Sequence, residues 1–423
     1  MNSLALILIF VANAISGIAQ GMSMIAIPWY FAQNEKLAFF GIVYLVTNFL
    51  SMFWMPFSGS IVDKYNRKKI FLVLNIVVGA ILLLISLVGY ARGALPPVMV
   101  ASVFVLTFLN YNIHYPCLYA FVQEIIEAKS YYKITSLLEI VGQITTIMAG
   151  AGATLLLEGT SNGSLNILGF KWQLGFDIAP WKIYEIFSLD AMTYFISFFI
   201  ILMIRFTPVV ARKIEQGSLI SRLKFGLEYL KQNSQVFWFG ILSYMVFLAV
   251  LLEAFYLGVS YVSNHLEASG DVYANSKIAY SMGAICVGLI IRYVFRYINI
   301  PFGIIVMTFF AGAIFLTLSL THSIYLFFAL MMFLGICNAG VRIARMTYLF
   351  KNVDNQFFGR AGSIFFLTNV VFRIILLFIF SIAFFQTDNH IVYAYMIVGG
   401  LLFLSSWFLV KHYYSFDRSL SDG

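Results

Sequence analysis

The chain has 423 residues, of which 61% are apolar and only 10% are charged, and its formal net charge is +8. A mean hydropathy of +0.91 is more than a water-soluble domain can bury in one core, so composition excludes a soluble protein. The apolar runs are long and continuous. This favours membrane-crossing helices of about 20 residues over the short alternating strands of a β-barrel.

Twelve apolar runs follow one another along the chain, each long enough to cross a hydrocarbon layer about 30 Å thick as a helix. The first, "MNSLALILIFVANAISGIAQ", lacks the basic start of a cleavable signal peptide and is too long for one. Cys117, Cys286 and Cys337 fall inside the runs, so no disulfide framework is indicated. The predicted spans are 4–32, 37–58, 70–90, 97–122, 135–157, 184–207, 235–262, 276–298, 301–320, 324–347, 362–386 and 390–411.

Two polar connectors interrupt this series. Residues 208–234 are basic and partly amphipathic, and they separate the spans into two groups of six. We therefore predict an all-α membrane protein with an N-terminal six-helix bundle at 1–207, a cytoplasmic linker at 208–234 and a C-terminal six-helix bundle at 235–423. The other connector, 158–183, is rich in Gly, Ser and Asn, and we expect a surface loop without chemistry of its own.

The distribution of Lys and Arg predicts which side of the membrane each loop faces. Of the 26 Lys and Arg residues, 20 lie in or beside the loops on the side of the N-terminus, five lie beside the opposite loops, and Arg373 lies inside a span. Basic loops stay on the cytoplasmic side. We therefore expect both termini in the cytoplasm and the protein in the inner (plasma) membrane. Anionic lipid accounts for the positive net charge, and we expect no nucleic-acid partner.

The segment "GSIVDKYNRKK" at 59–69 concentrates charge between two apolar spans. Its pattern of Gly, three residues, Asp, a basic residue, two residues, Arg and a further basic residue resembles the loop signature of the major facilitator superfamily. The resemblance implies a twelve-helix transporter with a latch that holds the outward-facing state. Gly59 is then expected to allow two helices to approach, and Asp63 to pair with Arg67 and with the N-terminal dipole of span 11. The implied latch residues are Gly59, Asp63, Lys64, Arg67 and Lys68.

Three further segments resemble the twelve-span drug exporters, a branch that includes macrolide and enterobactin efflux proteins. They are "YPCLYAFVQEIIEAKSYYKITSLLEIVGQ", "DAMTYFISFFIILMIRF" and "VDNQFFGRAGSIFFLTNVV". Span 4 lacks the Arg that many proton-coupled exporters carry, and span 5 lacks the Gly-Pro of their antiporter motif. In the second half, Arg292 follows Gly288 at the place where the first half has Asp63. The antiport motifs of the branch are thus incomplete here.

Polar residues inside the spans recur at helical spacing. Because a polar group facing hydrocarbon is costly, these stripes predict one central aqueous cavity that binds substrate. His114 and Cys117 share a helix face, and a soft-metal site is the alternative there to ordinary cavity lining. Two ligands do not make a site, so we expect no metal. The expected cavity residues are Asn13, Gln20, Asn110, His114, Gln143, Asn338, Asn369 and Arg373.

Three carboxyl groups are embedded in the spans and are candidates for proton coupling, namely Glu253, Glu139 and Asp190. Burial disfavours the charged form of a carboxyl group, which suits reversible protonation during transport. Asp190 is expected to lie close enough to the outer surface to be solvated. Structural pairing is the alternative for each carboxyl group. For Arg373, binding an anionic group or a carboxylate is the alternative to a structural role.

Regular α-helical spacing places three small or partly polar neighbours around Glu253, namely Ala249, Tyr256 and Ser260. Such a face favours a proton-exchangeable carboxyl group over an ion-pair cage. Glu139 has Gln143 one turn away near the expected cytoplasmic entrance, where it is suited to select cationic substrates or to exchange the proton itself.

These observations favour a secondary active transporter that exports small amphipathic molecules, such as drugs, toxins or siderophore-like compounds, by proton-coupled alternating access. The alternative is a lipid or lysophospholipid flippase, or a metal-ion exporter of the same fold, without proton antiport. The loop signature and the polar stripes disfavour a non-transporting receptor or assembly factor. No nucleotide-binding loop or catalytic motif indicates an enzyme. We expect a monomer without a cofactor, whose partners are its small-molecule substrate, protons and membrane lipids.

Overall fold

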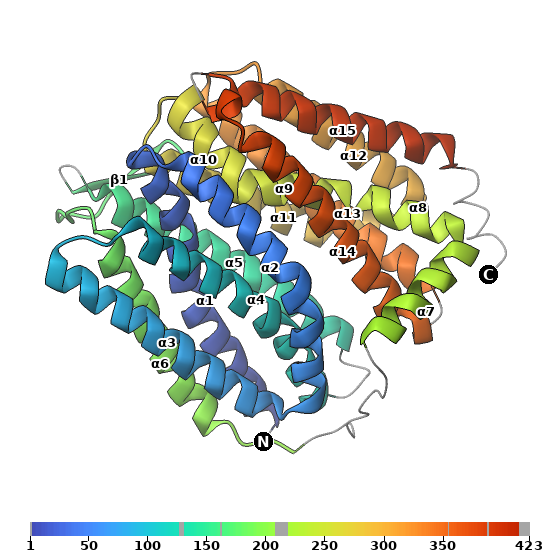
Figure 1. Cartoon of the computed structure of the whole chain (residues 1–423), viewed down its shortest axis with the longest axis horizontal. Coiled ribbons are helices and arrows are strands. Elements are labelled where there is room, and N and C mark those ends of the chain that lie inside the picture. Colours follow the sequence, from blue (N-terminus) through green and yellow to red (C-terminus); the bar gives the residue numbers. More distant parts are fainter. Residues whose placement is uncertain are drawn as a thin grey trace. The chain divides into compact units, whose positions relative to one another are not determined.

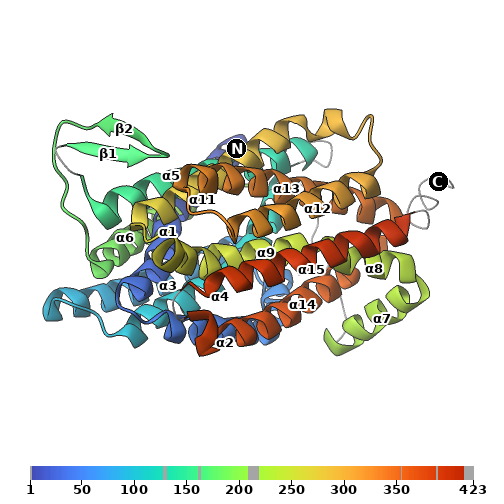
Figure 2. The same ribbon diagram turned by 90° about the horizontal axis from the view of Figure 1, so that it is seen from above.

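The computed structural model of the protein describes residues 2–126, 131–160, 163–207, 219–353, 355–386 and 389–413. Helices dominate these segments (Figures 1 and 2). Up to residue 207 the elements are α1 (Asn2–Gln33), α2 (Leu37–Lys64), α3 (Arg67–Arg92), α4 (Pro97–Ile125), α5 (Tyr131–Glu158), β1 (Ser164–Ile167), β2 (Phe170–Gln173) and α6 (Ile183–Met203). From residue 219 they are α7 (Leu219–Gln232), α8 (Ser234–Ser243), α9 (Met245–Leu252), α10 (Gly258–Ser260), α11 (Gly270–Val294), α12 (Ile300–Leu318), α13 (Ile324–Asn352), α14 (Asn355–Phe380) and α15 (Ile391–Lys411).

In the described part of the chain, 12 stretches are long and apolar enough to cross a membrane. Each overlaps one predicted span, which confirms the all-α, twelve-helix fold class. The seventh stretch, Ser234–His265, is not one regular helix. It consists of α8, α9 and α10 together with two π-helical segments, Glu253–Leu257 and Tyr261–His265. A π turn closes its hydrogen bond one residue later than an α turn, so it changes which side chains face the same way.

The helix α11 begins at Gly270, ahead of the predicted start of span 8 at 276. The sequence-based boundary left Asp271 outside the span, because charged residues are typical of loops. The Gly270 N–H donates to Oε1 of Glu158 at the end of α5 (2.8 Å), which satisfies one open N–H group of the helix start. The Lys277 ammonium lies over the Tyr273 ring, 4.5 Å from its centroid. These contacts let the helix start earlier than hydropathy indicates.

The chain divides into two compact units, Met1–Gln216 with Ser269–Ile278, and Gly217–Ala268 with Ala279–Gly423. In the first unit α1 packs against α4, α5 and α6, and α6 also packs against α3 (Figure 1). Gly89 permits the close approach of α3 to α6, because a Cβ there would lie 2.3 Å from Cβ of Tyr184.

In the second unit α12 packs against α13 and α15, and α7 packs against α14. The helix α7 lies within the residues predicted as a linker and is amphipathic. Its Tyr229 ring stacks on the ring of Phe357 with 4.4 Å between centroids. The linker residues 208–218 lie outside the described residues.

Part of the connector predicted as a loop is a β-hairpin (Figure 2). The strands β1 and β2 pair antiparallel, with Ile167 opposite Phe170. The two turn residues, Leu168 and Gly169, have φ of 53° and 85°. Positive φ at both positions is the pattern of a type I′ turn, which suits the right-handed twist of paired strands. The connector expected to be a surface loop thus contains a short hairpin at 164–173.

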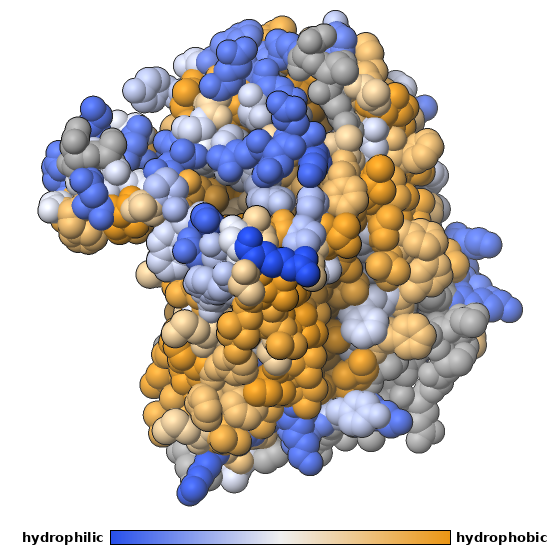
Figure 3. Space-filling model, turned by 60° about the vertical axis from the view of Figure 1, so that its left-hand side comes forward, coloured by the Kyte–Doolittle hydropathy of each residue, from blue (hydrophilic) through white to orange (hydrophobic). Residues whose placement is uncertain are grey.

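Large apolar side chains are exposed on many of the long helices, among them Leu84, Phe199, Met203 and Phe378. Figure 3 shows a broad apolar expanse on the face in view, with polar side chains toward its upper and lower edges. Such a surface is unfavourable in water, and a hydrocarbon layer covers it without cost.

Candidate functional site

The seventh span is interrupted at Tyr244, between α8 and α9. Nη1 of Arg345 on α13 donates to the carbonyl oxygen of Ser243 (2.9 Å), and Nδ2 of Asn369 on α14 donates to that of Tyr244 (3.1 Å). The Arg345 guanidinium also lies over the Tyr244 ring, 3.6 Å from its centroid. These side-chain bonds add to the backbone hydrogen bonds, which continue through Tyr244 from Gly240 to Leu248. The predicted cavity residue Asn369 is used in this contact and is buried.

Glu253 begins the first π-helical segment of span 7 and is 1% exposed. Its carboxyl group lies against Gly258, since a Cβ at Gly258 would be 2.3 Å from Oε1 of Glu253. The predicted face around Glu253 assumed regular α spacing, and the π turn replaces that spacing beyond Glu253. Tyr256, which was expected beside the carboxyl group, instead donates its hydroxyl hydrogen to the Phe380 carbonyl oxygen (3.1 Å).

Tyr280 on α11 interacts with Glu253 and with two residues of α13. It lies within electrostatic reach of Glu253 and of Arg342, and its hydroxyl accepts a hydrogen bond from Nδ2 of Asn338 (2.5 Å). A phenol and an amide are therefore hydrogen-bonded in the second unit, with a carboxyl group and a guanidinium in the electrostatic surroundings of the phenol. The sequence indicated Glu253 and Asn338 but not Tyr280, because tyrosine inside a span is usually a packing residue.

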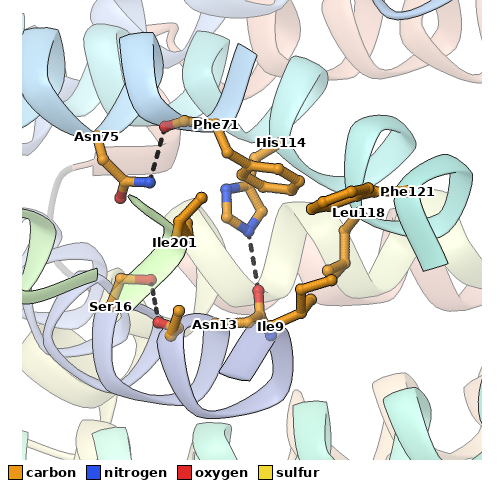
Figure 4. A pocket seen from close by; sticks show the side chains of 10 residues that line it. Ile9, Asn13, Ser16, Phe71, Asn75, His114, Leu118, Phe121 and Ile201 are labelled. Carbon is orange, nitrogen blue, oxygen red and sulfur yellow. Dashed lines mark hydrogen bonds between the residues drawn. The ribbon is translucent and has the colours of Figure 1, made fainter. Parts of the chain in front are cut away.

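The first unit contains a pocket with ≈ 270 Å³ of empty space, its opening included, between α1, α3, α4 and α6 (Figure 4). Oδ1 of Asn13 lies 2.8 Å from Nε2 of His114, and the Phe71 ring meets the His114 ring edge-on at 5.1 Å. An amide oxygen only accepts, so Nε2 carries the hydrogen and Nδ1 is left as an acceptor. The structure thus brings together two predicted cavity residues, Asn13 and His114.

Cys117, the other residue of the conceivable metal pair, is engaged elsewhere. Its Sγ donates to the Arg67 carbonyl oxygen (3.6 Å). Among the residues that the structure describes, no three His, Cys, Asp or Glu side chains are placed to hold a metal ion. His114 lines the pocket of the first unit, and Cys117 is not among the residues that line it.

The remaining predicted cavity and coupling residues lie on several helices and have different surroundings. Oε1 of Glu139 on α5 accepts a hydrogen bond from the Tyr119 hydroxyl on α4 (2.9 Å). Gln20 on α1 and Gln143 on α5 are half-buried. Arg373 on α14 is buried in the second unit. That all the predicted cavity residues line one path stays a prediction.

Asp190 on α6 is 0% exposed. The expectation that it is solvated near a surface is therefore wrong. Its Oδ2 accepts a hydrogen bond from the hydroxyl of Ser23 on α1 (2.8 Å), and the close packing of α6 against α1 and α3 encloses it. Ser23 was missed because a small hydroxyl residue in a span gives no signal until its partner is known.

The family follows from the sequence as a whole. The model of the Major Facilitator Superfamily matches residues 9–377. The chain belongs to the major facilitator superfamily. It is therefore a multi-pass membrane protein of a family of transporters, which are generally not enzymes. No curated protein matches the sequence.

Solved structures with the superfamily fold are similar to this chain. The nucleoside transporter NupG has a TM-score of 0.69 at 15% identity, over 97% of this chain and 99% of that one. A bacterial homologue of the iron transporter ferroportin, in an inward-facing state, has a TM-score of 0.68 at 13% identity, over 96% and 98% of the chains. A D-xylose-proton symporter has a TM-score of 0.66 at 10% identity, over 95% and 97%. At these identities the likeness shows the fold alone.

The loop signature of the superfamily covers the end of α2 and the start of α3, and it is anchored to two other helices. Nη1 of Arg67 donates to Oε2 of Glu124 (3.1 Å) and to the Ala120 carbonyl oxygen (3.0 Å), both on α4. Nζ of Lys68 donates to the carbonyl oxygens of Leu202 (3.0 Å) and Ile204 (2.8 Å) at the end of α6. Glu124, which the sequence did not single out, is thus the described ion-pair partner of Arg67.

The other latch residues give a mixed result. The side chain of Asp63 lies outside the described residues, so its pairing with Arg67 and with the dipole of span 11 stays a prediction. A Cβ at Gly59 would meet nothing within 4 Å in the described structure, so the close helix approach expected there is not observed. The Lys64 ammonium is exposed and lies over the Tyr65 ring, 5.5 Å from its centroid.

Proposed function

We propose that this superfamily member is a proton-coupled secondary transporter that exports small amphipathic molecules by alternating access. The observation that carries the proposal is the buried carboxyl group of Glu253 in a π-helical segment of span 7. Tyr280 lies within electrostatic reach of both this carboxyl group and the Arg342 guanidinium. A buried carboxyl group on a transport path is a candidate for proton exchange when the helices around it move.

The π turn supports this role. Turns of this kind inside α-helices are frequent at functional sites. In the π form, the segment Glu253–Leu257 holds the Glu253 carboxyl group against Gly258. Conversion to an α turn changes which residue the carboxyl group faces, so the helix form and the protonation of Glu253 are linked in this proposal.

The substrate class rests on the sequence. Three segments, in spans 4 to 6 and at the start of span 11, resemble the drug, macrolide and enterobactin exporters. Glu139 is partly buried and holds the Tyr119 hydroxyl, which suits a carboxylate that selects cationic substrates. The excess of Lys and Arg on one set of loops supports cytoplasmic termini and a plasma-membrane location.

Transport in proteoliposomes with an imposed pH gradient tests the proposal. A panel of cationic, neutral and anionic compounds identifies transported classes. Glu253→Gln should abolish uptake driven by the pH gradient while downhill substrate exchange continues, because only the protonation step is lost. Glu228→Gln, at an exposed position of α7, is the matched control.

Glu139→Gln distinguishes the role of Glu139 from that of Glu253. It should weaken transport of cationic compounds more than of neutral ones. If Glu253→Gln keeps full pH-driven transport and Glu139→Gln loses it, the coupling residue is Glu139. If both variants keep full pH-driven transport, the hypothesis of proton coupling through Glu253 or Glu139 is wrong. The alternative of a flippase or metal-ion exporter of the same fold is then favoured.

A further inference from the structure

The interface between α1 and α6 buries a carboxyl group that the proposed function does not use. Oδ2 of Asp190 accepts a hydrogen bond from the Ser23 hydroxyl (2.8 Å). Oδ1 of Asp190 has no hydrogen-bond partner among the described residues. Both side chains are fully buried. One neutral donor does not compensate the desolvation of a carboxylate, so this carboxyl group needs a cation, a proton or further donors.

The helices packed against α6 supply no such cation. The helix α1 contains no Asp, Glu, Lys, Arg or His, and its titratable residue is Tyr30. On α6 itself, Glu185 lies in the first turn and accepts from the backbone N–H of Lys182 (2.6 Å). The titratable groups of α3 lie only at its two ends and are Arg67, Lys68, Lys69, Tyr90 and Arg92. In the described structure, no charged side chain acts on Asp190 at close range.

A row of polar side chains leads from Asp190 toward α4. Tyr194 lies one turn further along α6 and within electrostatic reach of Asp190 and of Tyr115. The Tyr194 hydroxyl accepts a hydrogen bond from Nδ2 of Asn110 (3.1 Å), and Asn110 is buried. Asn110 precedes His114 by one turn on α4, so the two share a helix face.

The row ends at the pocket of the first unit. His114 is held there by Asn13, and its Nδ1 remains a proton acceptor. Figure 4 shows the His114 ring between Phe71 and Asn13 at the pocket. In the described structure the ring also lies against the rings of Phe71 and Tyr115. Asp190 and His114 are therefore two titratable groups in one enclosed polar row.

We propose that Asp190 is a proton-binding site inside the first unit, protonated in this conformation, and that its proton exchanges with the His114 pocket through Tyr194 and Asn110. The ligand is a proton on Oδ1, because Oδ2 accepts the hydrogen bond of the Ser23 hydroxyl. When the proton leaves Oδ1, a carboxylate remains, and His114 becomes an imidazolium by accepting a proton at Nδ1. The use of this proton site in a transport cycle depends on the proposed proton-coupled transport. Proton binding itself does not, because it is measured without transport.

Infrared difference spectroscopy of the full chain in lipid nanodiscs tests the site. The wild-type protein at neutral pH should show a protonated-carboxyl band that Asp190→Asn removes and Glu253→Gln leaves in place. Ser23→Ala should shift the frequency of this band, because the band reports hydrogen bonding to the carboxyl group. Identical spectra for wild type and Asp190→Asn at neutral pH would overturn the proposal. A band that appears only after sodium is removed would also overturn it, since Asp190 would then be ionised and hold sodium.

Deuterium exchange tests the path. In heavy water the Asp190 band should shift as its proton exchanges, and Tyr194→Phe and His114→Gln should slow that shift. Tyr90→Phe, at an exposed tyrosine of α3, is the control and should leave the rate unchanged. Exchange at the wild-type rate in both test variants would overturn the path through Tyr194. If Glu253→Gln loses pH-driven transport while its Asp190 band is unchanged, the transport role of Glu253 and proton binding at Asp190 are independent of each other.

Discussion

Arg345 and Tyr244 form a stacked pair at the interruption of span 7. The guanidinium lies 3.6 Å from the ring centroid and also donates to the carbonyl oxygen of the preceding residue, Ser243. Arg345 is 3% exposed although it carries a charge. A planar guanidinium does both tasks at once because its face stacks while its edge donates.

Arg345→Lys should therefore destabilise the protein although the charge is kept. An ammonium group cannot stack flat on Tyr244, and a lost hydrogen bond from a charged group costs about 1.5–3 kcal/mol. The unfolding midpoint in detergent, followed by intrinsic fluorescence on heating, measures the effect. Arg296→Lys, at an exposed position, is the control. Equal midpoints for the two variants would show that the stacked pair does not stabilise the fold.

Gly258→Ala should impair pH-driven transport. The added Cβ would lie 2.3 Å from Oε1 and 2.6 Å from the carbonyl oxygen of Glu253, so the carboxyl group or the π turn must shift. Gly400→Ala on α15, where a Cβ would meet nothing within 4 Å, is the matched control. Initial rates in proteoliposomes compare the two. If Gly258→Ala transports as well as Gly400→Ala, the contact between Glu253 and Gly258 has no part in coupling.

The ion pair of Arg67 and Glu124 should show a measurable coupling energy. Its side chains are 17% and 14% exposed, and contacting residues typically couple by about 0.5–3 kcal/mol in a double-mutant cycle. Arg67→Ala, Glu124→Ala and the double variant, unfolded by denaturant, give the value. A parallel cycle with Asp63→Ala tests the pair that the loop signature implies. A larger coupling to Asp63 than to Glu124 would make Asp63 the dominant partner.

The predicted orientation can be tested at two exposed positions, Lys171 on β2 and Glu228 on α7. Lys171→Cys and Glu228→Cys should react with an impermeant thiol reagent from opposite sides of the membrane, outside and inside respectively, because the span series places an odd number of spans between them. The background carries serine at the three native cysteines. Labelling of both positions from the same side would break the twelve-span assignment.

Hydropathy was enough to predict the spans, because each helix must bury about 20 apolar residues in lipid. It was not enough for residues whose role depends on a partner. Asp190 was placed near a surface by counting along its span, whereas its burial comes from the packing of α1 and α3. The sequence did not single out Ser23, Tyr280 or Glu124. The role of a hydroxyl or a carboxylate can be recognised only when the structure shows which group of another helix lies within bonding distance.

The helix-face prediction for Glu253 rests on an assumption that the structure does not keep. It assumed 3.6 residues per turn along the whole span. The interruption at Tyr244 and the π turn at Glu253 break that assumption, and no residue in "LLEAFYLGVS" marks a π turn by its type. In contrast, α1 and α4 do bring the predicted cavity residues Asn13 and His114 within hydrogen-bond distance, and that they bind substrate stays a prediction.

The two π segments of span 7 also affect how this chain is aligned with other transporters. Each π turn accommodates one residue more than an α turn, so relative to an uninterrupted helix the following residues are rotated by about 100°. An alignment that forbids gaps inside membrane helices would then compare residues on different faces after Glu253, and again after Tyr261. Single-residue gaps within Glu253–Leu257 and Tyr261–His265 restore the correspondence.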